Sequence, residues 1–217
     1  GWLTLSAGLA DDCKGNCLAD LIYIPENPFD YDKLIEDIKK VQETKKQIVI
    51  AVSEGIRFAD GQLVSESEAK DVFGHGQLGG AAKTVSEYIK EKLGVKVRAV
   101  EINVLQRCAA HCLSLTDINE SFAIGEKAFE TAANGLSGVM VTSTRKDSEN
   151  YGLELSYSDI SLIANMEKTV PAEFMNEEKN GISEDGIEYL RPLILGEVNI
   201  PKKNGLPVYL SLKNFMD

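Results

Sequence analysis

Short apolar runs alternate along the chain with amphipathic segments, which is the pattern of strands and helices in turn. Residues 18–25 form a β-branched, aromatic-containing run typical of a buried strand, and residues 47–52 form a continuous apolar run of strand length, as expected for a strand covered on both faces. Pro25 ends the first run because its nitrogen cannot donate to a strand ladder. Between the two runs, Asp30 is placed to cap a helix with one apolar face, formed by Leu34, Ile35, Ile38 and Val41.

The alternation continues as far as residue 143. We predict helices at residues 82–92 and 116–134 and strands at 95–104 and 138–143. Gly94 should end the first of these helices, and the second should turn an apolar side inward, made of Ile118, Phe122, Ile124, Ala128, Phe129 and Ala132. Strands and helices in this order predict an α/β fold: an open, mostly parallel sheet flanked by helices in a Rossmann-like three-layer arrangement.

The pattern loosens after residue 144. Short helices are expected at residues 158–166 and 183–195, followed by a strand or extended tail at 201–212. We therefore assign residues 1–145 to one α/β domain. Residues 146–217 are interpreted as a helical and extended extension packed on the same domain.

The charge balance restricts the kinds of partner. The chain has 34 acidic and 23 basic residues, a net charge of -11, which argues against a surface that collects nucleic acid or anionic lipid. A bound phosphate would therefore depend on a few particular arginines. No apolar stretch has the ~18 residues of a membrane span and no basic leader is present, so we expect no membrane association and a cytoplasmic location.

Two motifs that suggest metal or nucleotide binding are weak. The four cysteines form two C-x3-C pairs, whereas structural zinc sites usually contain C-x2-C, so we expect small buried thiols and no metal site. Residues 74–79 spell G-x-G-x-x-G, but the dinucleotide fingerprint must follow a strand directly, and residues 65–72 are charged and polar. We interpret residues 74–80 as a loop that leads into a helix.

Candidate chemistry lies where predicted strands end, because ligands of open α/β sheets bind outside the carboxyl ends of the strands. Glu54 follows the second strand, and Arg98 and Arg107 lie in and just after the third. Guanidinium groups match phosphate oxygens, and a carboxylate accepts hydrogen bonds from hydroxyls. These residues predict a site for a phosphorylated sugar, the alternative being that both arginines are ordinary surface charges.

Four motifs resemble the phosphofructokinases in order and spacing: GWLTLSA at 1–7, IYIPE at 22–26, IAVSEG at 50–55 and RAVEINVLQR at 98–107. The resemblance covers residues 1–145 and is closest to the long bacterial branch, which contains ATP-dependent and pyrophosphate-dependent members. It implies that Glu54 holds the sugar hydroxyls of fructose 6-phosphate and that Arg98 and Arg107 bind its phosphate. The loop that would contribute to the same site contains Val104, Leu105 and Gln106.

One position departs from the family pattern. Val104 stands where many members have a His or Tyr that also touches the phosphate. The resemblance therefore implies that this contact is lost here or is replaced, for example by Asn103.

The resemblance also implies an activity, the transfer of a phosphoryl group to the 1-hydroxyl of fructose 6-phosphate in glycolysis, by a homo-oligomer with Mg2+ and either ATP or pyrophosphate. The family's Gly-rich donor loop, its catalytic aspartate stretch and its Met-Gly-Arg are not found in these 217 residues. We therefore expect a sugar-phosphate-binding part with no catalytic residue, inactive alone, with Mg2+ bound by the other half. The alternative is a noncatalytic α/β module that senses a sugar phosphate or a nucleotide.

Overall fold

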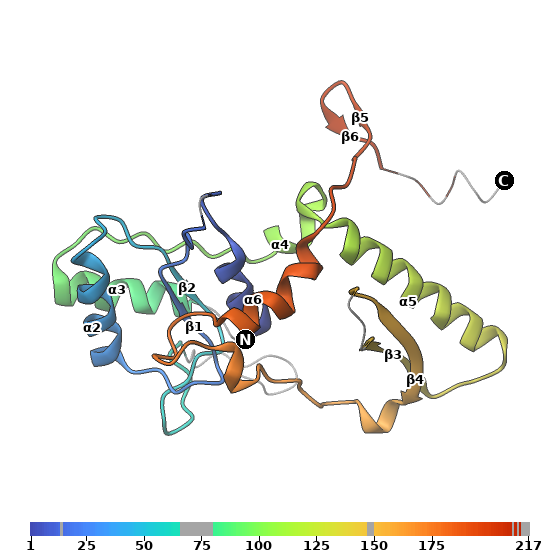
Figure 1. The fold of residues 1–217 in the computed structure, drawn as a ribbon, viewed down its shortest axis with the longest axis horizontal. Helices are drawn as coiled ribbons and strands as arrows, with labels where there is room; N and C mark the ends of the chain where they lie inside the picture. Colours follow the sequence, from blue (N-terminus) through green and yellow to red (C-terminus); the bar gives the residue numbers. More distant parts are fainter. Residues whose placement is uncertain (14, 66–79, 147–149, 210, 212, 214–217) are drawn as a thin grey trace. The chain divides into compact units, whose positions relative to one another are not determined.

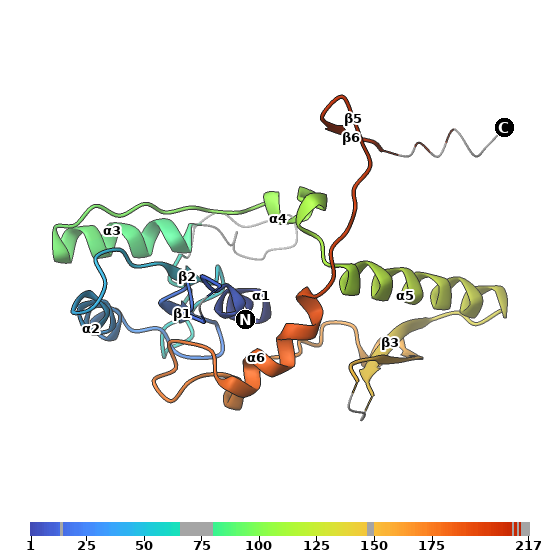
Figure 2. The same cartoon turned by 45° about the horizontal axis from the view of Figure 1, so that its top comes forward.

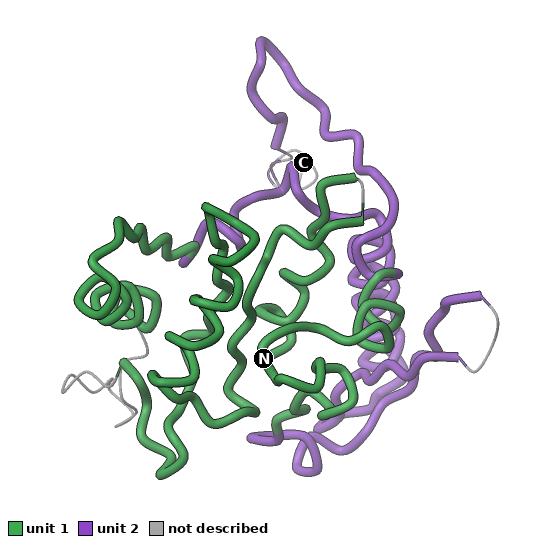
Figure 3. The backbone as a smooth tube through the Cα atoms, turned by 60° about the vertical axis from the view of Figure 1, so that its left-hand side comes forward, with its two compact units in different colours: residues 1–102, 167–191 green, residues 103–166, 192–217 purple. Residues whose placement is uncertain are grey.

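The computed structural model describes every residue except 14, 66–79, 147–149, 210, 212 and 214–217. It forms two compact units, residues 1–102 with 167–191 and residues 103–166 with 192–217 (Figure 3). The units divide the chain differently from the predicted domain of residues 1–145: residues 103–145 belong to unit 2 and residues 167–191 to unit 1. The G-x-G-x-x-G segment lies outside the described residues.

A strand–helix–strand motif organises unit 1 (Figure 1). Strand β1 (Leu21–Tyr23) pairs in parallel with β2 (Ile50–Val52), and helix α2 (Tyr31–Gln42) connects them. The carboxylate of Asp30 accepts hydrogen bonds from the backbone N–H groups of residues 32 and 33, which confirms the predicted cap. The parallel pairing of the first two predicted strands is also confirmed.

The core of unit 1 lies between the strands, α2 and α3 (Ala81–Leu93). Gly94 ends α3 in the left-handed conformation with φ 64°, as predicted. One cluster joins the buried side chains of all these elements, among them Leu21, Tyr23, Phe29, Leu34, Ile38, Ile56, Val85 and Ile89. The buried faces of both helices therefore follow the apolar periodicity of the sequence.

A buried polar pair lies beside this core. The hydroxyl of Tyr23 donates to Asp37 Oδ2 at 2.9 Å, and Lys33 Nζ donates to Asp37 Oδ1 at 3.4 Å. Burial, and secondarily the negative charge of Asp37 and this hydrogen bond, raise the pKa of the Tyr23 hydroxyl. The folded state therefore requires a neutral Tyr23.

The segment 167–191 completes unit 1 by packing on the start of the chain. Trp2, in α1 (Trp2–Leu5), has ring centroids 5.9 Å from Phe174 and 5.4 Å from Tyr189, and its indole N–H donates to the Lys168 carbonyl at 2.7 Å. The N–H of Ile22 donates to the Asn180 carbonyl at 2.7 Å. The short elements involved are η1 (Ser6–Leu9), η4 (Ala172–Phe174) and α6 (Glu184–Leu190).

Unit 2 is built on a long helix and a hairpin. Helix α5 (Leu115–Ala133) contacts strands β3 (Val139–Arg145) and β4 (Leu153–Asp159), which are antiparallel with Val139 opposite Asp159 (Figure 2). The remaining short elements are α4 (Leu105–Cys108), η2 (Ala110–Cys112), η3 (Ile160–Leu162), η5 (Arg191–Ile194), β5 (Lys202–Lys203) and β6 (Leu206–Pro207).

Four sequence predictions are wrong in detail. Residues 95–104 form no strand, because the chain is unpaired up to Asn103, whose φ of 49° turns it toward α4. The predicted strand at 138–143 exists but pairs antiparallel with β4, and β4 occupies the start of the helix predicted at 158–166. The predicted inner side of α5 leaves two of its phenylalanines, Phe122 and Phe129, exposed. In the described part of the chain, no helix has the length and apolarity to cross a membrane.

We predict that Gly8→Ala destabilises unit 1. Gly8 is buried, and a Cβ there would collide with Cγ2 of Ile182 and lie 3.2 Å from Ile22 Cδ1. Overpacking of this kind costs about 1–3 kcal/mol. The midpoint of urea unfolding, followed by the fluorescence of Trp2, the only tryptophan, should fall.

Gly125→Ala is the matched control. Gly125 lies in α5, and no atom lies within 4 Å of its added Cβ, so alanine should stabilise α5 by about 0.5–1 kcal/mol. The Trp2 transition should not move. An unchanged midpoint for Gly8→Ala would contradict the close packing of η1 against Ile182.

We predict that Tyr23→Phe reduces the alkaline sensitivity of unit 1. The pKa of Tyr23 is raised in the folded state, so the stability it contributes is complete below the unfolded pKa of about 10 and is lost as the pH rises beyond it. The variant should lose about 1 kcal/mol at pH 7 through the hydrogen bond, but its urea midpoint should fall less between pH 9 and 11. Tyr209→Phe, at an exposed ring, should behave as the wild type.

Candidate functional site

The ends of β1 and β2 lie side by side, as expected for a parallel pair. The N–H of Ser53, just after β2, donates to the Tyr23 carbonyl at 3.0 Å. A Cβ on Gly55 would lie 3.3 Å from Cγ of Pro25, so the turns that follow the two strands are in contact. The structure therefore brings together two of the three strand ends that the sequence singles out.

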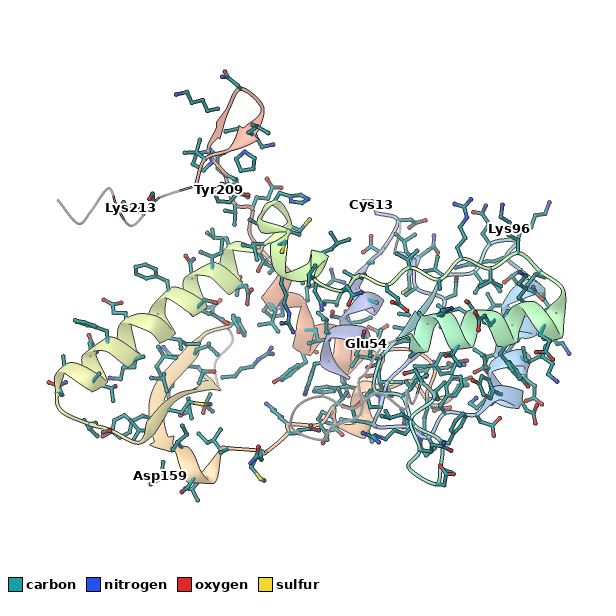
Figure 4. All side chains as sticks on the ribbon, turned by 180° about the vertical axis from the view of Figure 1, so that it is seen from behind. Cys13, Glu54, Lys96, Asp159, Tyr209 and Lys213 are labelled. Carbon is teal, nitrogen blue, oxygen red and sulfur yellow. The ribbon has the colours of Figure 1, made fainter. Side chains whose placement is uncertain are left out.

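Glu54 is exposed in the turn after β2 (Figure 4). The sequence argument for Glu54 relied on the cost of burying a carboxylate after an apolar strand, but this carboxylate is solvated, so that cost does not arise. No hydrogen bond or ion pair engages its side chain within the described residues. Glu54 is thus available to accept hydrogen bonds from a ligand.

Glu26, at the end of β1, is a second carboxylate at the same edge, and it is absent from the residues predicted to bind. Its Oε1 accepts a hydrogen bond from the N–H of Val170 at 2.9 Å, and the amino group of Gly1 lies 3.8 Å from the same oxygen. Its Oε2 is buried and has no hydrogen-bond partner among the described residues. From the sequence, Glu26 is recognisable as the end of a strand. Nothing in the sequence indicates that the backbone at residue 170 packs against the Glu26 carboxylate.

Arg98 lies in the extended segment that follows α3 in unit 1. It is exposed, and its side chain makes no ion pair or hydrogen bond in the part of the chain that the structure describes. Its charge is therefore not neutralised by a neighbouring carboxylate.

The other predicted ligands form one short structure in unit 2. Val104 and Leu105 are exposed at the start of α4, and the N–H of Arg107 donates to the Val104 carbonyl at 2.9 Å. Gln106 and Arg107 line a hollow of about 380 Å3, whose wall also includes Cys108, Ala109, Ala110, Leu113 and Tyr209. A second hollow of about 370 Å3, at the start of α2, contains none of the predicted ligands.

The predicted residues divide between the two units. Glu54 and Arg98 belong to unit 1, and residues 104–107 belong to unit 2. The convergence of Glu54, Arg98 and Arg107 on one ligand stays a prediction. The geometry within each unit leaves all three side chains accessible.

The described residues do not form a metal site. No group of three or more His, Cys, Asp or Glu side chains among them could hold an ion. The prediction of buried thiols is wrong for Cys13, Cys108 and Cys112, which are exposed, the last two at the ends of the short helices α4 and η2, and only Cys17 is half-buried. The described residues therefore offer no ligand set for Mg2+, and no chemical step is assigned to a metal on them.

Comparisons with known proteins agree with this α/β architecture. A crystal structure of a pyrophosphate-dependent phosphofructokinase from Nitrosospira multiformis matches 97% of the chain with a TM-score of 0.79 and 34% identity. The family model described as Phosphofructokinase matches residues 1–132. The chain belongs to the phosphofructokinase family, and the predicted α/β class is confirmed.

Relatives with the name pyrophosphate–fructose 6-phosphate 1-phosphotransferase cover nearly the whole chain. The protein of Methylococcus capsulatus is 40% identical over 99% of this chain, and that of Halomonas elongata is 37% identical over 95%. The matches cover 51% and 49% of those two proteins. The chain therefore spans about half the length of the curated relatives it matches.

Proposed function

We propose that this chain supplies the sugar-phosphate recognition of an enzyme that transfers a phosphoryl group from pyrophosphate to the 1-hydroxyl of fructose 6-phosphate, a step of glycolysis. The observation that carries the proposal is the identity of 40% and 37% to two proteins of that name across almost the entire chain. Such an enzyme would act in the cytoplasm as a homo-oligomer.

In this proposal Arg98 and Arg107 bind the 6-phosphate and Glu54 accepts hydrogen bonds from the sugar hydroxyls. The supporting observation is that all three are accessible and carry no competing ion pair among the described residues. The net charge of -11 repels a phosphate dianion at long range, so binding requires local cations. Gln106, with Val104 and Leu105, would shape the wall beside Arg107, since Gln106 and Arg107 share one hollow.

The relatives' names favour pyrophosphate over ATP as the donor. Phosphoryl transfer depends on positioning and on neutralising phosphate charge, a task that Mg2+ performs when bound. We assign the Mg2+ ligands and the catalytic base to the half of the enzyme that this chain does not match. The chain alone should therefore bind fructose 6-phosphate weakly and transfer nothing.

We predict that Arg98→Gln and Arg107→Gln weaken sugar-phosphate binding selectively. The test uses a chimera in which this chain replaces the matching half of the Methylococcus capsulatus protein. Loss of one charged partner of a buried phosphate costs about 2–5 kcal/mol, so the KM for fructose 6-phosphate should rise at least ~30-fold. The KM for pyrophosphate should stay within about twofold, because uniform binding of the donor is untouched.

Arg191→Gln removes an exposed arginine outside the proposed site and is the matched control. Equal fructose 6-phosphate KM values for the control and the two site variants would reject the assignment of the arginines. Calorimetry of the isolated chain tests the noncatalytic alternative. Tight binding of a sugar phosphate or a nucleotide by residues 1–217 alone would favour a sensing module instead.

A further inference from the structure

The β5–β6 hairpin folds back so that Tyr209 lies close to where the chain enters it. Its two-residue turn consists of Asn204 and Gly205, whose φ angles of 54° and 82° are the left-handed values of a type I′ turn. The N–H of Val208 donates to the Pro201 carbonyl at 2.9 Å and closes the hairpin at its base. Tyr209 follows this hydrogen bond directly and is therefore held beside the entry to the hairpin (Figure 4).

The entry to the hairpin is itself fixed next to the segment that contains α4 and η2. Ser114, the cap of α5, forms a β-bridge with Glu197, and the N–H of Leu115 donates to the Gly196 carbonyl at 2.9 Å. The helix η2 ends at Cys112, two residues before that cap. Contacts between distant segments of unit 2 therefore bring the residue after the hairpin to the residues of α4.

Tyr209 and Arg107 line the same hollow as a result. The volume of about 380 Å3 is that of a site for a small molecule. Three residues, Gln106, Arg107 and Tyr209, bring polar groups to its wall, and the rest of the wall is formed by Cys108, Ala109, Ala110 and Leu113. A mostly apolar wall with a few polar groups is typical of ligand sites, where the polar groups fix the orientation of the ligand.

The hydroxyl of Tyr209 is not used by the fold. The ring is 79% exposed, and its hydroxyl makes no hydrogen bond to any residue that the structure describes. A single exposed aromatic ring is ordinary on a protein surface. Tyr209 differs because it shares a hollow with a guanidinium that also has no ion pair among the described residues. Both side chains can therefore turn their donors to a ligand in the hollow.

We propose that Tyr209 is a further binding residue for the phosphate of the sugar substrate, with its hydroxyl donating to a phosphate oxygen that Arg107 leaves free. A guanidinium donates to two oxygens of a phosphate in parallel, which leaves a third oxygen to accept from another group. A phenol donates without a second positive charge, so it does not repel the guanidinium beside it. This inference rests on the proposed function, which assigns Arg107 to the 6-phosphate.

The same geometry assigns the selectivity for a phosphorylated sugar to one hollow. Val104, at the start of α4, has no side-chain donor, so the polar groups of this hollow come from Gln106, Arg107 and Tyr209. A site built to hydrogen-bond a group of the substrate rejects an analogue that lacks the group, because its own polar atoms are then left without partners. Fructose without its phosphate should therefore gain nothing from Tyr209.

The first test removes only the hydroxyl. Tyr209→Phe is made in the Methylococcus capsulatus chimera that carries this chain. A hydrogen bond to a charged group is strong enough that the KM for fructose 6-phosphate should rise at least about tenfold. The KM for pyrophosphate and kcat should stay within about twofold, since uniform binding of one substrate is lost. Tyr157→Phe, at another exposed tyrosine of unit 2 that does not line the hollow, is the matched control and should change neither KM.

Arg107→Gln in the same chimera separates this inference from the proposed function. A raised fructose 6-phosphate KM for Arg107→Gln together with an unchanged one for Tyr209→Phe would overturn the role of Tyr209 and leave the proposed function standing. An unchanged KM in both variants would overturn the two together. The double variant should raise the KM by less than the product of the single effects, because both residues bind one phosphate. A strictly multiplicative effect would place the hydroxyl at another part of the substrate and contradict the proposal.

A binding measurement covers the case in which the chimera does not fold. Fluorotyrosine is incorporated at position 209 of residues 1–217, and its fluorine NMR signal is followed while fructose 6-phosphate is added into the millimolar range. The signal should shift with fructose 6-phosphate and with inorganic phosphate but not with fructose, and Arg107→Gln should weaken the response. Fluorotyrosine at position 157 should not respond. An unmoved signal at position 209, or an equal shift with fructose, would overturn the inference.

Discussion

The parallel pairing of β1 with β2 is the constraint on which the described site depends. A parallel pair needs a crossover, here α2, and it aligns the carboxyl ends of both strands at one edge. That alignment puts the turn after Tyr23 beside the turn after Val52, where the N–H of Ser53 donates to the Tyr23 carbonyl and a Cβ on Gly55 would meet Pro25. The core beneath, which includes Leu34 and Ile38, holds the two strands in this register.

The elements that the sequence predicts correctly are the ones that local forces determine. Each of these signals is local. The helix cap at Asp30, the helix end at Gly94 and the periodicity that predicts helices α2, α3 and α5 all depend on residues only a few positions apart in the sequence. The return of residues 167–191 and the pairing of β4 with β3 depend on contacts between distant segments, such as Trp2 with Tyr189. No local pattern encodes such a pairing, so the boundary predicted at residue 145 could not anticipate it.

The assignment of the binding residues stays a prediction, and its members rest on different evidence. The end of the second strand locates Glu54, whereas the strand predicted at 95–104 does not form, so Arg98 and Arg107 rest on the family resemblance alone. Periodicity predicted helix α5 but not its buried face: it grouped Ile124 with Phe122 and Phe129, whereas Ile124 is half-buried and the two phenylalanines are exposed. The sequence did not indicate the buried carboxylate of Glu26 for a related reason, since Val170, whose N–H donates to its Oε1, is distant in sequence.

The residues proposed to bind the 6-phosphate lie in different units, Arg98 in unit 1 and Arg107 in unit 2. Each of the two is exposed and makes no ion pair among the described residues, so neither is held in place by a carboxylate. A phosphate that bound both would have to fix the two units and both side chains, and the conformational entropy lost would offset part of the free energy of the two guanidinium–phosphate contacts.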